Sequence, residues 1–182
     1  MSLWVVRHAQ PLIEPGICYG ALDVPADPIA TQQAARALAQ VLPHGAVLQT
    51  SVLQRCEQLR QAICGLRPDL THQPEPRLVE MNFGIYEGVA WVDISKDALD
   101  AWTQDFAQHR FGGQESVAEF MTRVAAVWDE CLAEPREDRV WITHAGVARS
   151  TLLLAQGIRV PRSAQQWPAG APAFGQWMEV IC

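Results

Sequence analysis

The segment SLWVVRHA, residues 2–9, joins a run of apolar side chains directly to an arginine and a histidine. Such a run is typical of a short buried strand, here Ser2–Val6, that ends at the charged pair Arg7-His8. A second segment, VWITHAG at residues 140–146, repeats the arrangement, because a predicted strand over Arg139–Thr143 is followed by His144 and two small residues. We therefore predict two strands that each present a histidine at the carboxyl end.

Helical patterns separate the predicted strands. We expect helices at 31–42, 51–65, 116–132 and 146–156, one or two short helices within 92–106, and further strands at 46–49 and 176–181. Alternating strands and helices predict an α/β fold, a three-layer α/β/α sandwich with a mostly parallel central sheet. Since ligands bind at the carboxyl edge of such a sheet, the two histidines are expected to meet there. Without repeats or a linker, residues 1–182 are interpreted as one domain.

The composition indicates a folded protein and disfavours several classes of partner. The chain has 182 residues, of which 49% are hydrophobic and 19% charged, so it can bury a core and is not disordered. Its net charge of −6 disfavours nucleic acid and anionic membranes as partners. No apolar run is long enough to span a bilayer or to form a signal peptide. Five scattered cysteines without a CxxC pair indicate reduced thiols, so a cytoplasmic protein is expected.

A histidine at a strand end has a simple structural explanation as well as a chemical one. Taken alone, His8 or His144 is more simply a residue with satisfied hydrogen bonds than a catalytic group. Two histidines at equivalent strand ends favour a shared site instead. A neutral imidazole can accept a phosphoryl group on one ring nitrogen while a hydrogen bond holds the other.

Two arginines and a glutamate fit the same chemistry. A guanidinium binds two phosphate oxygens at once, and Arg7 is adjacent to His8. Arg55 falls in the first turns of a predicted helix, where backbone N–H groups also favour anions, although without other evidence for a phosphate a solvated helix face is the default explanation. Glu80, between an apolar pair and a Phe-Gly turn, is a candidate proton donor. Composition alone favours a surface position for both Glu80 and Glu87.

Four ordered segments together resemble the histidine phosphatase superfamily, also called phosphoglycerate-mutase-like. Its signature is Arg-His-Gly after a strand, Ser-x-x-x-Arg on a helix, Glu-x-x-Phe-Gly-x-x-Glu-Gly, and Ser-His-Gly after a late strand. This chain has, in the same order, Arg7-His8-Ala9, Ser51–Arg55, Glu80–Gly88 and Thr143-His144-Ala145. The segments span nearly the whole chain.

The resemblance implies a role for each matching residue. His8 would be the phosphorylated nucleophile and Glu80 the proton donor, while Arg7, Arg55 and His144 would bind the phosphoryl oxygens. No metal ion or other cofactor would be required, because the cationic side chains take the place of a metal.

The chain departs from the family pattern at a few positions. Ala9 and Ala145 replace glycines, and Pro11 and Glu14 stand where many relatives have Thr and Asn. We expect the carboxylate of Glu14 to point away from the phosphate, which it would repel. Three arginines outside the motif are expected to be surface or structural residues: Arg77, Arg149 and Arg159.

Within the superfamily, the short chain resembles the phosphatases more than the longer mutases. The stretches CYGALDVP at 18–25 and LQRC at 53–56 are similar to alpha-ribazole phosphatases, which act late in cobalamin biosynthesis. This similarity implies that Cys18, Tyr19 and Gly20 bind substrate, with alpha-ribazole 5′-phosphate as a candidate.

Two segments are expected to wall the pocket: the loop at 10–28, and a helical or loop segment at 89–113 that would cover the active site. Four aromatic residues of the second segment could stack on an aromatic leaving group, although each alone is more simply a core residue: Trp91, Trp102, Phe106 and Phe111.

These observations predict a metal-independent phosphatase that hydrolyses a small phosphomonoester through a phosphohistidine. A phosphoglycerate-mutase-type phosphoryl transferase, a protein phosphohistidine phosphatase and a non-catalytic phospholigand-binding protein on the same fold remain open. The expected partner is a small phosphomonoester, with no nucleic acid and no membrane, and the sequence is compatible with a monomer or a homodimer.

Overall fold

The computed structural model describes residues 2–134 and 138–181 and contains a five-stranded sheet in the order β3-β2-β4-β1-β5. The strands are β1 (Ser2–Arg7), β2 (Val47–Thr50), β3 (Thr71–Pro74), β4 (Arg139–Thr143) and β5 (Trp177–Ile181). The first four are parallel to one another, and β5 pairs antiparallel with β1 at the edge. The prediction of a mostly parallel sheet is confirmed.

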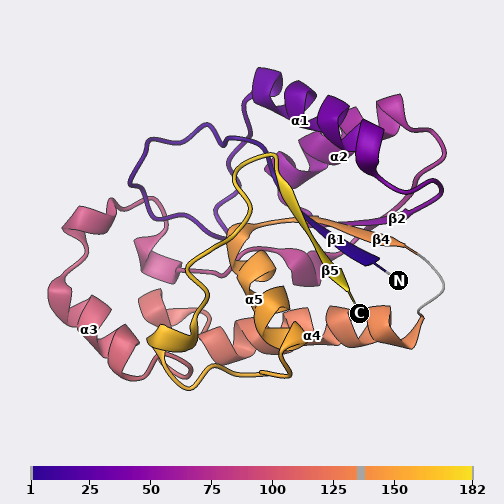
Figure 1. The fold of residues 1–182 in the computed structure, drawn as a ribbon. Helices are drawn as coiled ribbons and strands as arrows, with labels where there is room; N and C mark the ends of the chain where they lie inside the picture. Colours follow the sequence, from indigo (N-terminus) through magenta and orange to yellow (C-terminus); the bar gives the residue numbers. More distant parts are fainter. Residues whose placement is uncertain (1, 135–137, 182) are drawn as a thin grey trace.

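Helices cover both faces of this sheet (Figure 1). On one face lie α1 (Pro28–Val41) and α2 (Gln54–Leu66), and on the other lie α4 (Val117–Ala133) and α5 (Ala145–Ala155). The shorter α3 (Lys96–Gln104) lies to one side of the sheet. Helices and sheet therefore form the three layers expected from the sequence. No helix in the described ranges combines the length and the apolar character needed to cross a lipid bilayer.

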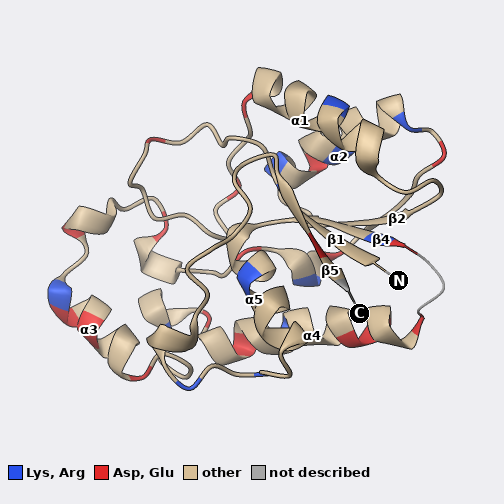
Figure 2. Ribbon diagram, in the orientation of Figure 1, with Lys and Arg blue, Asp and Glu red and all other residues tan. Residues whose placement is uncertain are grey.

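The core is divided in two by the sheet, as the alternation of side chains along β1 requires. Leu3 and Val5 pack with α4 and α5, whereas Trp4 and Val6 pack with α1 and α2. Charged residues of both signs are spread over the helices and loops (Figure 2). The four described cysteines form no disulfide, and Cys182 lies outside the described residues.

Two helix starts differ by three residues from the sequence-based expectation for clear reasons. Helix α1 begins at Pro28, three residues earlier than expected, because Asp27 caps it by accepting the Ala30 N–H at 2.7 Å. Proline is favoured at the first helical position, so this proline starts the helix and does not belong to the loop. Helix α2 begins at Gln54 and not at Ser51, and Ser51 is the residue that directly follows β2.

Strand β3 was not expected at all. All four of its side chains are exposed, because β3 is the outermost strand next to β2. An exposed edge strand buries neither face, so its sequence THQP carries no apolar pattern that would indicate a strand.

Candidate active site

The carboxyl ends of three neighbouring strands bring distant residues together. In the register of the sheet, Arg7 pairs with Thr143 and Thr50 pairs with Ile142. The next residues therefore meet at one edge: His8 donates its backbone N–H to Thr143 O at 3.0 Å, and Ser51 donates to Ile142 O at 3.0 Å. The His8 and His144 ring centroids lie 5.2 Å apart. The two histidines thus share one site, as the parallel sheet predicts.

His8 is held as a neutral base with one free nitrogen. Its ring is 2% exposed, and Nδ1 lies 2.7 Å from Ala9 O. A carbonyl oxygen only accepts, so Nδ1 carries the proton and Nε2 keeps its lone pair. Burial, followed by the charges of Arg55 and Arg7, lowers the pKa of His8 to about 3. This is the state that a nucleophilic imidazole requires.

His144 carries its proton on the opposite nitrogen. Its Nε2 lies 2.8 Å from Ser51 Oγ, which also receives the Leu53 N–H at 3.4 Å. The fully buried Ser51 hydroxyl needs an acceptor, so it donates to His144 Nε2 and leaves the proton on Nδ1. Burial, then the charge of Arg55, lowers the pKa of His144 well below its usual range. Nδ1–H is buried without an acceptor among the described residues and is available to a bound anion.

Arg7 is fixed by the segment that leads into β5. Its Nη1 donates to Pro172 O at 3.1 Å, and its guanidinium lies 3.8 Å from the centre of the Phe174 ring. Burial lowers the pKa of Arg7, while Tyr19 and Glu80 act in the opposite direction. Its Nε has no partner in the described chain. The side chain is therefore oriented by protein and keeps donors for a ligand.

Arg55 fixes a loop and keeps donors that could bind an anion. Its side chain is fully buried, and Nη1 and Nη2 donate to Leu22 O at 2.8 Å and Gly20 O at 2.6 Å. Nε is buried without a described partner. Because a guanidinium has five N–H donors, Arg55 can hold the loop and still bind an anion.

Glu80 reaches the amino-terminal end of α5. Its Oε2 accepts the Gly146 N–H at 2.8 Å, and its Oε1 accepts the Met81 N–H at 3.1 Å. A Cβ atom on residue 146 would lie 2.1 Å from Glu80 Oε1, so any larger residue there would displace the Glu80 carboxylate. Arg123 fixes the main chain by donating to Glu80 O at 3.1 Å and to the carboxylate of Glu115. The carboxyl group is thus held at the amino-terminal end of α5, in the cavity that both histidines line.

One cavity of about 350 Å³ is lined by both histidines and by Arg7, Arg55 and Glu80. This volume suits a small molecule. The remainder of the wall is mainly aromatic and apolar. The lining residues are Arg7, His8, Tyr19, Arg55, Glu80, Met81, Phe83, Trp91, Trp102, Phe106, Val117, Phe120, His144, Ala145, Gly146, Arg149 and Trp167.

The structure places one of the three residues expected to bind substrate in the wall of the cavity. Tyr19 lines the cavity, and its ring lies 5.4 Å from the Arg55 guanidinium. Cys18 is fully buried in a small cluster with Ile94 and Phe111, and burial raises the pKa of its thiol to about 12. Gly20 also lies outside the lining and instead accepts Arg55 through its carbonyl, with Met81 O only 1.8 Å from where a Cβ would stand. Cys18 and Gly20 therefore shape the loop that carries Tyr19 and lie outside the lining of the cavity.

Glu87 has a structural role that the sequence did not reveal. Its two oxygens accept the backbone N–H groups of Gly20, Ala21, Leu22 and Phe83 at 2.8–3.1 Å. The carboxylate therefore fixes the loop that carries Tyr19 and is not an unattached surface group. The only hint of this role in the sequence was that the segment 80–88 contains a second glutamate, Glu87, after Glu80.

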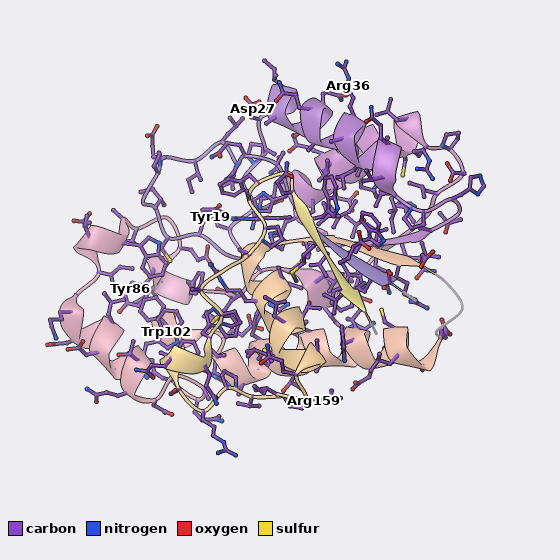
Figure 3. The ribbon with its side chains drawn as sticks, in the orientation of Figure 1. Tyr19, Asp27, Arg36, Tyr86, Trp102 and Arg159 are labelled. Carbon is purple, nitrogen blue, oxygen red and sulfur yellow. The ribbon has the colours of Figure 1, made fainter. Side chains whose placement is uncertain are left out.

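The aromatic residues of the covering segment divide between cavity and core. Trp91, Trp102 and Phe106 line the cavity, whereas Phe111 is fully buried and stacks on Trp102 with ring centroids 4.4 Å apart. Figure 3 places Trp102 on α3 and Tyr19 on the long loop that precedes α1. Both segments expected to wall the pocket thus contribute side chains to it.

The arginines outside the motif do not behave alike. Arg77 pairs with Glu75 and Glu130, and exposed Arg159 pairs with Asp129, as expected for surface or structural residues. Arg149, in contrast, lines the cavity, which corrects the expectation for this residue. Exposed Glu14 does not line the cavity, in line with the expectation that it points away.

The buried histidines make stability depend on pH. Unfolding restores His8 from a pKa of about 3 to its usual 6.5, so the unfolded chain binds more protons between these values and stability falls as pH falls. We expect wild type to lose about 2 kcal/mol more unfolding free energy than His8→Asn between pH 7 and pH 5. Urea unfolding at the two pH values measures this, with His44→Asn, which removes an exposed imidazole, as control. Equal losses in wild type and His8→Asn would contradict a neutral, buried His8.

The comparisons with known proteins agree with this geometry. A family model described as histidine phosphatase superfamily (branch 1) matches residues 3–169. A search of curated proteins found no significant match. Within residues 2–134 and 138–181, no three His, Cys, Asp or Glu side chains are grouped as metal ligands would be.

Solved structures share the fold over almost the whole chain. A mycobacterial glucosyl-3-phosphoglycerate phosphatase is 21% identical with a TM-score of 0.81, over 98% of this chain and 88% of its own. A structure called mycobacterial hydrolase 2 is 22% identical with a TM-score of 0.81, over 98% and 80% of the two chains. The protein TTHB049 from Thermus thermophilus is 26% identical with a TM-score of 0.72, over 99% and 93%.

Proposed function

This chain belongs to the histidine phosphatase superfamily, and from that membership we propose that it is a phosphatase that hydrolyses a small phosphomonoester through a phosphohistidine at His8. The observation that carries the proposal is the state of the His8 ring, with Nδ1–H bound to Ala9 O and Nε2 free in a cavity that also holds Arg7, Arg55 and His144. We propose that the reaction uses no metal ion and no other cofactor.

In the first step, His8 Nε2 attacks the phosphorus atom and forms a P–N bond. The bond from phosphorus to the ester oxygen breaks, and protonated Glu80 gives its proton to the departing oxygen. Charge increases on the phosphoryl oxygens in this step. The guanidiniums of Arg7 and Arg55 and the Nδ1–H of His144 are the donors that stabilise it.

In the second step, water attacks the phosphorus atom of the phosphohistidine. The Glu80 carboxylate accepts a proton from this water, the P–N bond breaks, and His8 recovers the lone pair on Nε2. Inorganic phosphate leaves, and Glu80 holds the proton needed for the next cycle. The same residue thus acts first as acid and then as base, because the leaving group departs from the side of phosphorus at which water later attacks.

The aromatic walls support an ester whose leaving group has an apolar ring. Trp91, Trp102, Phe106 and Trp167 all line the cavity. We propose an aromatic small-molecule phosphomonoester as the substrate class and retain alpha-ribazole 5′-phosphate as one candidate from the sequence resemblance. A hydrolysis panel of phosphomonoesters that includes it, together with 3-phosphoglycerate to detect isomerisation, separates a phosphatase from a mutase.

Replacement of Glu80 tests the acid–base role. We expect Glu80→Gln to lower kcat by about 10²–10³-fold for an alkyl phosphate, whose leaving oxygen needs a proton. The loss for 4-nitrophenyl phosphate should be much smaller in the first step, because nitrophenolate departs without protonation. Single-turnover kinetics with the two esters measure this difference.

The control for this change is Glu130→Gln, which removes an exposed carboxylate that pairs with Arg77. Its rates with both esters should stay near those of wild type. Equal losses in Glu80→Gln for the good and the poor leaving group would contradict proton donation by Glu80.

A further inference from the structure

Arg149 is a cavity residue that the proposed reaction does not use. It lies on α5 and lines the same cavity as His8 and Glu80. Its one described hydrogen bond is a long one, from Nη2 to Ala169 O at 3.4 Å, and its Nε is buried without a partner in the described chain. No described carboxylate pairs with it, unlike exposed Arg159, which pairs with Asp129. Burying a charge is costly without a partner, so a half-buried guanidinium without a carboxylate can bind an anionic ligand.

Helix α5 connects the position of Arg149 to that of Glu80. On α5 it is three residues after Gly146 and four after Ala145, so all three share one face of the helix. Gly146 is the residue whose N–H holds Glu80, and Glu80 protonates the departing oxygen in the proposed mechanism. A leaving group that departs past Glu80 can therefore reach the helix face that carries Arg149.

The charges in the cavity point in the same direction. Among the lining residues Arg7, Arg55 and Arg149 are positive, and Glu80 is the acidic residue. When Glu80 is protonated for the first step, a phosphate dianion neutralises two of the three guanidiniums. One positive charge is left over, and a second anion on the substrate would neutralise it.

We propose, as a deepening of the proposed function, that Arg149 binds a second anionic group on the leaving group of the substrate. The substrate class is then a phosphomonoester whose leaving group combines an apolar ring with a carboxylate or a second phosphate. Trp102 and Trp167 provide walls for the ring, and Arg149 receives the anion in the same cavity. A guanidinium suits either anion, because its donors match two oxygens of a carboxylate or a phosphate.

Binding of arylphosphonates tests this proposal without turnover. Isothermal titration calorimetry compares 3- and 4-carboxyphenylphosphonate with the matching carboxamides, which have the same shape and no charge on that group. We expect at least one acid to bind wild type at least about tenfold more tightly than its amide. Phenylene bisphosphonates in place of the acids show whether a phosphate is preferred to a carboxylate.

Variants assign the preference to Arg149. Arg149→Met should reduce the ratio of acid to amide affinity to about one, and Arg149→Lys should keep part of it, since it keeps the charge. Arg36→Met, which removes an exposed arginine on α1, should keep the wild-type ratio and controls for net charge. The amide serves as the internal reference for each variant.

Two results would overturn the inference. In the first, wild type prefers neither the acids nor the bisphosphonates to the amides; in the second, such a preference survives in Arg149→Met. If no doubly anionic phosphonate binds to wild type, the inference is overturned as well. Hydrolysis of phenyl phosphate, measured separately, keeps the two proposals apart. Turnover without an anion preference overturns only the role of Arg149, whereas an anion preference without turnover overturns only the phosphatase.

Discussion

Replacement of His8 by asparagine is expected to lower kcat for phenyl phosphate by about 10⁴-fold or more, because no other group in the cavity takes over as nucleophile. Asparagine keeps a polar group of similar size, so the Ala9 carbonyl need not lose its partner. The free Nε2 of His8 is the atom that the substitution removes. Steady-state kinetics of the purified variant measure the loss.

The matched control is His44→Asn, in which the lost imidazole is 89% exposed. This variant should keep wild-type rates. If His8→Asn retained turnover within tenfold of wild type while circular dichroism showed a native fold, a covalent step at His8 would be contradicted.

Replacement of Arg55 by methionine is expected to lower kcat by about 10²–10³-fold, the usual cost of losing one donor to a charged transition state. Arg55 is fully buried and also fixes the loop of Tyr19 through Leu22 O and Gly20 O. The variant should therefore also raise KM. Arg55→Lys keeps the charge but cannot offer two parallel donors, so it should recover only part of kcat.

Arg60→Met is the control on the same helix, since Arg60 pairs with Glu57 and does not line the cavity. It should show wild-type kinetics. A kcat for folded Arg55→Met equal to that of Arg60→Met would contradict the role of Arg55 at the phosphoryl group.

The sequence predicted the reacting edge of the sheet because two strand patterns end in histidine. His8 and His144 follow buried parallel strands, and the shared direction of such strands determines where their ends meet. Arg7 and Arg55 followed from the same placement, one beside a histidine and the other on the helix after β2. For the histidines, local patterns and one rule of sheet architecture indicated a shared site, whereas the role of Arg55 followed from the family resemblance.

Contacts formed only by the folded chain could not be predicted in this way. Cys18 and Tyr19 are neighbours in the chain, yet one is buried under α3 residues and the other lines the cavity. Glu87 is recognisable as a clamp only after four N–H groups converge on it. Arg149 has no motif of its own, and its face of α5 is known only once Glu80 is seen bound to Gly146. These positions depend on tertiary structure, which neither composition nor periodicity encodes.

The most direct measurement is the site of covalent phosphate during a single turnover of phenyl phosphate. Rapid quenching in alkali preserves a phosphohistidine, and peptide mass spectrometry locates it. The account predicts one phosphoryl group on His8, formed and lost at rates consistent with kcat and absent in His8→Asn. Full turnover with a phosphoryl group on another residue, or with none on His8 at any time within the turnover, would contradict it.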